Sequence, residues 1–151
     1  MKPRTLLKSS LVTGIGGITA GVLSPGAVIA AYPKGAFDSE EVVAGLSSAF
    51  GVSELKQSSD ISIRAPAIAQ DGEVVPIQVS ADIEAVESIS IIVEKNQNPF
   101  VASFNLQGSV AFVSTRIKMG KTSNVLAVVK AGGSLYSASQ EIKVSKSGCG
   151  A

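Results

Sequence analysis

The sequence has one cysteine, Cys149, and its chemistry is the natural starting point. Cys149 lies two residues before the end of the chain, with Gly148 before it and Gly150 after it. The thiolate is the reactive form of a cysteine, and a free thiol has a pKa of about 8.5. Because glycine has no side chain and wide backbone freedom, nothing in the local sequence crowds this sulfur. The neighbouring residues therefore favour an accessible nucleophile at the C-terminus.

Other reactive groups are scarce in the 151 residues, which contain no histidine, no tryptophan and a single cysteine. The absence of histidine excludes a histidine-based triad, a histidine general base, a c-type haem motif and most zinc and copper sites. One cysteine also excludes an internal disulfide framework. The chain is long enough for one domain, and its composition of 45% apolar and 17% charged residues is sufficient for a hydrophobic core. We therefore expect no metal, no cofactor and no nucleic-acid partner.

Two uses of a lone terminal cysteine remain open. A buried structural role does not suit a residue flanked by glycines at the end of the chain, and prenylation needs the cysteine one position earlier. An inter-chain disulfide that holds a dimer is one alternative. A tethered nucleophile that carries a group covalently is the other. Four extended residues beyond Ser145 reach roughly 13–14 Å, so the thiol could enter a pocket in another protein.

The charged side chains of the rest of the chain indicate a catalytic or binding site less clearly than Cys149 does. Lys143 and Lys146 would favour the thiolate of Cys149, whereas the C-terminal carboxylate would disfavour it, and the sequence does not decide between them. Four carboxylates lie between residues 82 and 94, at spacings that do not indicate a catalytic pair: Asp82, Glu84, Glu87 and Glu94. Three cations could attract an anion, although a solvated strand end is the favoured interpretation: Arg116, Lys118 and Lys121.

The first 31 residues have the pattern of a signal peptide. Basic residues without an acid precede an apolar run from Leu11 to Ala31, which ends in small residues. We expect cleavage after Ala30 or Ala31 and no stable membrane insertion afterwards. A transmembrane anchor is disfavoured because glycines and Pro25 interrupt the run.

The leader also indicates the compartment. The stretch Arg4–Lys8 resembles the second half of a twin-arginine motif, with Pro3 in place of the first arginine, so Tat and Sec export both remain open. Either route predicts a periplasmic protein. Removal of residues 1–30 takes away three basic residues and leaves ten basic and twelve acidic ones, a net charge of −2.

One short helix is predicted over residues 38–50 of the mature chain. Asp38 is the expected N-cap, with Glu41 as the reciprocal partner of a capping box. A stripe of apolar residues at helical spacing should pack on the following sheets, and it comprises Val42, Val43, Leu46 and Phe50. Gly51 fits the position after the last turn.

From residue 61 onward the apolar residues recur with a period of two, which indicates strands. Short alternating runs follow one another between turn residues, without a helical run between them: 61–64, 75–80, 89–94, 100–104, 110–119, 125–129 and 136–144. We therefore predict an all-β, immunoglobulin-like antiparallel β-sandwich of about seven strands over about 60–145. Pro76 within a strand suggests an edge position. Residues 32–151 form one domain that ends in a flexible C-terminal arm, 146–151.

Several stretches together resemble the SoxY family of the thiosulfate-oxidation (Sox) system. They are "IRAPAIAQDGEVVP" from Ile63, "VEKNQNPFVASF" from Val93, "TRIKMGKTSNVLAVV" from Thr115 and "LYSASQEIKV" from Leu135. The terminal "SGCGA" is similar to the family's GGCGG, with Ser147 and Ala151 in place of the outer glycines. Together with the exported leader, the resemblance spans nearly the whole chain.

The resemblance implies an immunoglobulin-like, non-enzymatic sulfur carrier of the periplasm. By position, Cys149 would hold the sulfur intermediates covalently, and Gly148, Gly150 and Ser147 would be the hinges of a swinging arm. The family forms a heterodimer with the subunit SoxZ. It also docks transiently with a haem-containing loading enzyme (SoxAX), a hydrolase (SoxB) and, in some organisms, a sulfur dehydrogenase (SoxCD).

Two further hypotheses remain beside the carrier. One is an exported structural β-sandwich that dimerises through a terminal inter-chain disulfide. The other is an enzyme in its own right, which would require turnover by the isolated chain. The sequence supports the carrier best, because its only strong nucleophile lies on a glycine-flanked tail.

Overall fold

A computed structural model describes residues 33–51, 54–106 and 108–145 of the chain. The predicted leader (1–31), the C-terminal arm (146–151) and all four residues proposed for the arm site lie outside the described residues. These four are Ser147, Gly148, Cys149 and Gly150.

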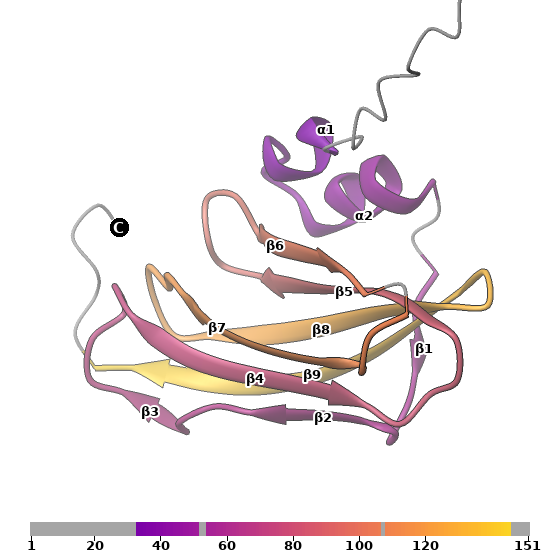
Figure 1. Cartoon of the computed structure of the whole chain (residues 1–151). Helices are drawn as coiled ribbons and strands as arrows, with labels where there is room; N and C mark the ends of the chain where they lie inside the picture. Colours follow the sequence, from indigo (N-terminus) through magenta and orange to yellow (C-terminus); the bar gives the residue numbers. More distant parts are fainter. Residues whose placement is uncertain (1–32, 52–53, 107, 146–151) are drawn as a thin grey trace, which may run out of the picture. The chain divides into compact units, whose positions relative to one another are not determined.

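The described chain folds into two sheets that pack face to face (Figure 1). The larger sheet has the strand order β1-β9-β8-β5-β6, with β3 also paired to β9, and the smaller has the order β2-β4-β7. The bounds are β1 Lys56–Gln57, β2 Ile61–Arg64, β3 Ile68–Ala69, β4 Val75–Ala81, β5 Val86–Val93, β6 Phe100–Asn105, β7 Phe112–Ile117, β8 Ser123–Ala131 and β9 Ser134–Val144. The predicted immunoglobulin-like sandwich is confirmed.

The seven longer strands correspond to the seven predicted runs, and two short strands are additional. Strands β1 and β3 have two residues each and pair parallel with β9, whereas the longer strands pair antiparallel. A two-residue strand has no periodicity for the sequence to display. The parallel pairings matter because β3 holds the end of β9, the strand that precedes the predicted arm.

The alternation of apolar residues produces the core between the sheets. Ile77 of β4, Ile91 of β5 and Ala127 of β8 are among the buried residues of one cluster that joins the two sheets. Ile142 of β9 belongs to the same cluster and is 0% exposed. These side chains point inward because every second residue of a strand faces the same side.

The N-terminal region forms two helices instead of the one predicted over 38–50. Helix α1 spans Lys34–Phe37 and α2 spans Val42–Phe50, so the second helix begins four residues later than expected. Asp38 ends α1: its backbone N–H donates to Lys34 O, and its carboxylate pairs with the Lys34 ammonium. Glu41 precedes α2 in an extended conformation with no side-chain cap. The predicted capping box is therefore wrong, because α1 already uses Asp38.

The helices cover the outer face of the larger sheet (Figure 1). Leu46 of α2 packs in a second buried cluster with Phe100 of β6 and Val128 of β8. Val43 was expected on the same apolar stripe but is 61% exposed. The buried face includes Gly45 instead. At this position α2 lies close to α1, because a Cβ on Gly45 would stand only 3.4 Å from Ala36 O. Gly51 follows α2 with φ of 73°, as predicted.

The expected edge position of Pro76 is wrong for the strand as a whole, because β4 is the central strand of the smaller sheet. On one side Pro76 is paired with Arg116 of β7. On the other side β2 pairs only with Gln78–Ala81. Pro76 therefore lies where β4 has a single neighbour, and its missing N–H disrupts no ladder on the open side.

The packing of α2 predicts a clear contrast between two residues of the same helix. Leu46→Ala should lower the free energy of unfolding by about 2–4 kcal/mol, because it leaves a cavity beneath the helix. Val43→Ala should lower it by less than about 0.5 kcal/mol, because Val43 faces solvent. Urea unfolding of the two variants measures both values. Equal losses would show that α2 does not pack on the sheet through Leu46.

Candidate functional site

The base of the arm, residues 143–145, is held by strand β3. Ile68 and Ala69 pair parallel with Lys143 and Val144. The Ser145 N–H donates to Ala69 O at 3.0 Å, and the Ser145 hydroxyl lies 3.3 Å from the same carbonyl oxygen. These contacts continue the strand pairing to the last residue that the structure describes.

A second contact holds the base of the arm from the other side. The Val144 N–H donates to Thr122 Oγ1 at 2.9 Å. Thr122 directly precedes β8, whose first residue, Ser123, pairs with Ile142. The end of β9 thus lies between β3 and the start of β8, and the next residue of the chain begins from a fixed point. Four extended residues from Ser145 to Cys149 would span roughly 13–14 Å.

Ser123 links the base of the arm to the loop between β5 and β6 (94–99). Its side chain is 1% exposed, and its Oγ accepts the Lys95 N–H at 3.0 Å. The same hydroxyl donates to Asn124 O at 2.9 Å. Two successive residues therefore hold different segments, since Thr122 binds the base of the arm and Ser123 binds the loop that carries Lys95.

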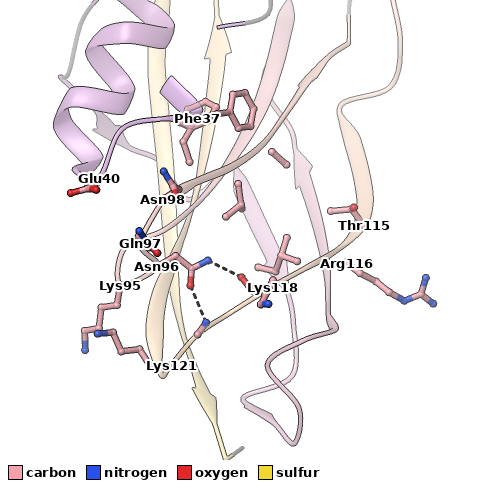
Figure 2. Close-up of a pocket in the computed structure, with 15 residues that line it drawn as sticks. Phe37, Glu40, Lys95, Asn96, Gln97, Asn98, Thr115, Arg116, Lys118 and Lys121 are labelled. Carbon is pink, nitrogen blue, oxygen red and sulfur yellow. Dashed lines mark hydrogen bonds between the residues drawn. The ribbon is translucent and has the colours of Figure 1, made fainter. Parts of the chain in front are cut away.

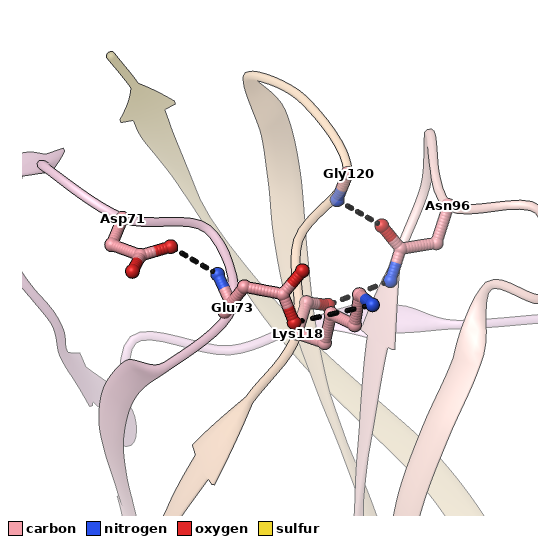
Figure 3. A network of polar contacts seen from close by, with 5 residues as sticks. All are labelled: Asp71, Glu73, Asn96, Lys118 and Gly120. Carbon is pink, nitrogen blue, oxygen red and sulfur yellow. Dashed lines mark hydrogen bonds and ion pairs between the residues drawn. The ribbon is translucent and has the colours of Figure 1, made fainter. Parts of the chain in front are cut away.

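Asn96 ties this loop to the segment between β7 and β8 (118–122). Its Nδ2 donates to Lys118 O at 2.8 Å, and its Oδ1 accepts the Gly120 N–H at 3.0 Å (Figure 3). Lys118 Nζ lies 3.2 Å from Glu73 Oε2. The Met119 N–H donates to Gly72 O at 2.7 Å, so the loop after β3 joins the same network. Three loops at this end of the sandwich are thereby held together.

A groove of about 1320 Å³ lies beside this network (Figure 2). Its walls include residues 100–102 of β6 and 115–117 of β7. The β5–β6 loop (94–99) and the β7–β8 segment (118–122) close one end. Lys95 and Lys121 contribute exposed cations at that end, whereas the Arg116 guanidinium points away from the labelled loop residues (Figure 2). The cations Arg116, Lys118 and Lys121, noted in the sequence, do line one groove, but Lys118 pairs with Glu73.

Sequence reasoning missed Lys95, Asn96, Thr122 and Ser123. The run from Asn96 to Pro99 indicated only a turn, and nothing local marks the long-range partner of Asn96. Thr122 and Ser123 precede an apolar strand in the manner of ordinary loop residues. Their roles depend on hydrogen bonds to residues more than twenty positions away.

The carboxylates of the body have separate contacts. Glu87 Oε2 lies 2.8 Å from Lys130 Nζ, and this hydrogen bond lowers the pKa of the Glu87 carboxyl. Glu94 accepts a hydrogen bond from Asn124 Nδ2 at 3.0 Å. Among residues 33–51, 54–106 and 108–145, no cluster of three potential metal ligands occurs. None of the helices in those ranges has the length and apolar character that a membrane span requires.

The comparisons with known proteins agree on one family. The family model "Sulfur oxidation protein SoxY" matches residues 46–149, a range that ends at Cys149. The solved structure of the sulfur carrier protein SoxY from Chlorobium limicola f thiosulfatophilum is 39% identical, covers 67% of this chain and 93% of its own, and has a TM-score of 0.59. An engineered protein is 12% identical over 57% of this chain and 20% of its own, at a TM-score of 0.39 that supports no argument. No curated protein gives a significant match.

The contact between Thr122 and Val144 predicts a local effect at the base of the arm. Thr122→Val should keep the side-chain shape but leave the Val144 N–H without its acceptor, at a cost of about 1 kcal/mol. Hydrogen exchange of the Val144 amide should accelerate. Thr115→Val is the matched control, because Thr115 lies in β7 of the smaller sheet, whereas Val144 lies in β9 of the larger one. Unchanged exchange at Val144 would contradict the anchoring role of Thr122.

Proposed function

Because the chain belongs to the SoxY family, we propose that it is a periplasmic sulfur carrier of the thiosulfate-oxidation system. It holds sulfur intermediates covalently on Cys149 and presents them to partner enzymes. The observation that carries the proposal is the family match, which runs to Cys149. The anchored residues just before the arm support it, because a carrier needs a fixed base from which its reactive end extends.

The loading reaction follows from thiol chemistry. A sulfur–sulfur bond forms between Cys149 Sγ and the sulfane sulfur of thiosulfate, while the thiol proton is released to water. This step is an oxidation, so two electrons pass to the haem-containing loading enzyme. Hydrolysis then adds water to the terminal sulfonate group, which releases sulfate and leaves a persulfide on Cys149. The carrier contributes only the sulfur atom, and its partners supply the oxidant and the hydrolytic site.

A tethered nucleophile suits this division of work. Once the body docks on a partner, the arm confines Cys149 to a small volume around Ser145, and the effective concentration of the carried group rises to the millimolar range or above for a linker as short as ~4 residues. The two glycines beside Cys149 let the arm adopt different backbone conformations in different active sites. Ser147 and Ala151 replace the outer glycines of the family's motif, and both are small. A SoxZ-like subunit completes the proposed carrier as a heterodimer.

The first test of the proposal concerns the thiol itself. Protein isolated from thiosulfate-grown cells should carry mass adducts on the C-terminal peptide that a reductant removes. Cys149→Ser should abolish both the adducts and thiosulfate-dependent electron transfer with the partner enzymes, without a change in thermal stability. Intact-mass analysis and a reconstituted assay measure the two effects.

Two results would contradict the carrier. One is full activity of the Cys149→Ser variant. The other is a stable disulfide-linked homodimer in non-reducing electrophoresis that remains functional in the assay. That result would favour the exported structural module.

The second test concerns the hinge. Gly150→Pro fixes φ at the residue after Cys149 and should lower the rate of loading by about tenfold or more, because the sulfur must align closely with the attacked atom. Ser147→Gly is the matched control within the same arm, and its loading rate should stay within about twofold of the original. Single-turnover kinetics with the loading enzyme measure both variants. Equal rates for Gly150→Pro and Ser147→Gly would exclude a hinge at Gly150.

A further inference from the structure

The groove between β6 and β7 is an open side of the sandwich. Strand β6 ends the larger sheet and β7 ends the smaller one, so each has a neighbour on one side only. Exposed strand edges keep unpaired backbone groups that can bind an extended segment of another protein. At about 1320 Å³ the groove is far larger than a single ion requires, and its dimensions suit a peptide segment.

The charge at the loop end of the groove is positive. Lys95 and Lys121 are both exposed there, and neither belongs to an ion pair within the described residues. Glu40 is the one acidic residue among those that line the groove in the described part of the chain. The lining therefore favours an acidic ligand.

The same end of the groove adjoins the base of the arm. Lys121 directly precedes Thr122, whose hydroxyl oxygen binds the Val144 N–H. The Lys95 N–H is bound to Ser123, and Asn96 joins the two loops that carry the cations. A surface docked at Lys95 and Lys121 would thus lie beside the segment that precedes the predicted arm.

We propose that this groove is the docking surface for an acidic segment beside the active-site entrance of the enzymes that act on the carried sulfur. The inference rests on the proposed carrier function. Without its predicted leader the chain has a net charge of −2, so its overall charge does not attract an acidic partner. Lys95 and Lys121 supply the local attraction, and Asn96 joins the two loops that carry them before the partner arrives, which limits the ordering cost of docking.

The test compares two double variants with the same change in total charge. Lys95→Glu with Lys121→Glu reverses the groove cations, whereas Lys56→Glu with Arg64→Glu reverses exposed cations on β1 and β2. Each is assayed as the mature carrier with its copurifying subunit for loading by the haem-containing enzyme, at carrier concentrations from well below to well above KM. Thermal unfolding confirms that all variants fold.

We expect kcat/KM for loading to fall by about tenfold or more in the groove variant and by less than about twofold in the control. The loss should appear in KM, and it should shrink as the ionic strength rises to about 0.5 M. Equal effects in the two variants, no loss in the groove variant, or a loss in kcat alone would overturn the proposal. If the unmodified carrier is not loaded at all, the proposed function fails instead.

Three further results would assign the groove to another occupant and overturn the proposal. Dissociation of the copurifying subunit from the groove variant would assign the groove to that subunit. A change in self-association of the carrier in sedimentation velocity would assign it to a second copy. In the groove variant, the rate of Cys149 alkylation by iodoacetamide without any enzyme present could also change, by as much as kcat/KM for loading changes. That result would assign the groove to the chain's own arm.

Discussion

The hydrogen bond from the Val144 N–H to Thr122, together with the parallel pairing of β3, holds the end of β9 in place. A tethered group can be delivered accurately only if one end of its tether is fixed. An unpaired end of β9 would fray, as exposed strand ends do, and the origin of the arm would then vary by several residues. The contacts on both sides of residues 143–145 hold the end of β9, the point from which the predicted arm would start.

The remaining architecture can be understood as support for this one strand. β9 is the longest strand, with 11 residues, and it pairs with β8 from Ser134 to Ile142. Ile142, just before the base of the arm, is fully buried in the core between the sheets. The helices stabilise the opposite face of the same sheet through Leu46 and Leu135. Ile142 and the polar clamp therefore hold the same end of β9, whereas the helix contacts at Leu135 hold its other end.

Much of this fold could be predicted because alternating apolar residues report directly on strands. Gly51 was also predictable, since its positive φ is a local requirement. The failures have non-local causes: Asp38 is used by α1, Gly45 brings α2 close to Ala36, and the neighbours of Pro76 depend on how far β2 extends.

The same distinction applies to the site. Cys149 is conspicuous from its neighbours alone, whereas Thr122, Ser123 and Asn96 matter because of partners distant in sequence. The local sequence marks the predicted reactive group, but only the tertiary contacts show which residues hold the end of β9 and the neighbouring loops.

Under the proposed function, the fixed base also limits how partners can be used. Every enzyme must receive Cys149 within roughly 13–14 Å of Ser145, so every enzyme must dock on surface close to the base of the arm. Surfaces of the size that specific complexes bury, about 800 Å² on each partner, cannot be placed twice in that area without overlap. The enzymes must therefore act on the carrier in turn, and each must release it before the next can bind. Weak, charge-guided docking fits this requirement better than tight apolar contact, because its attraction speeds association without slowing release.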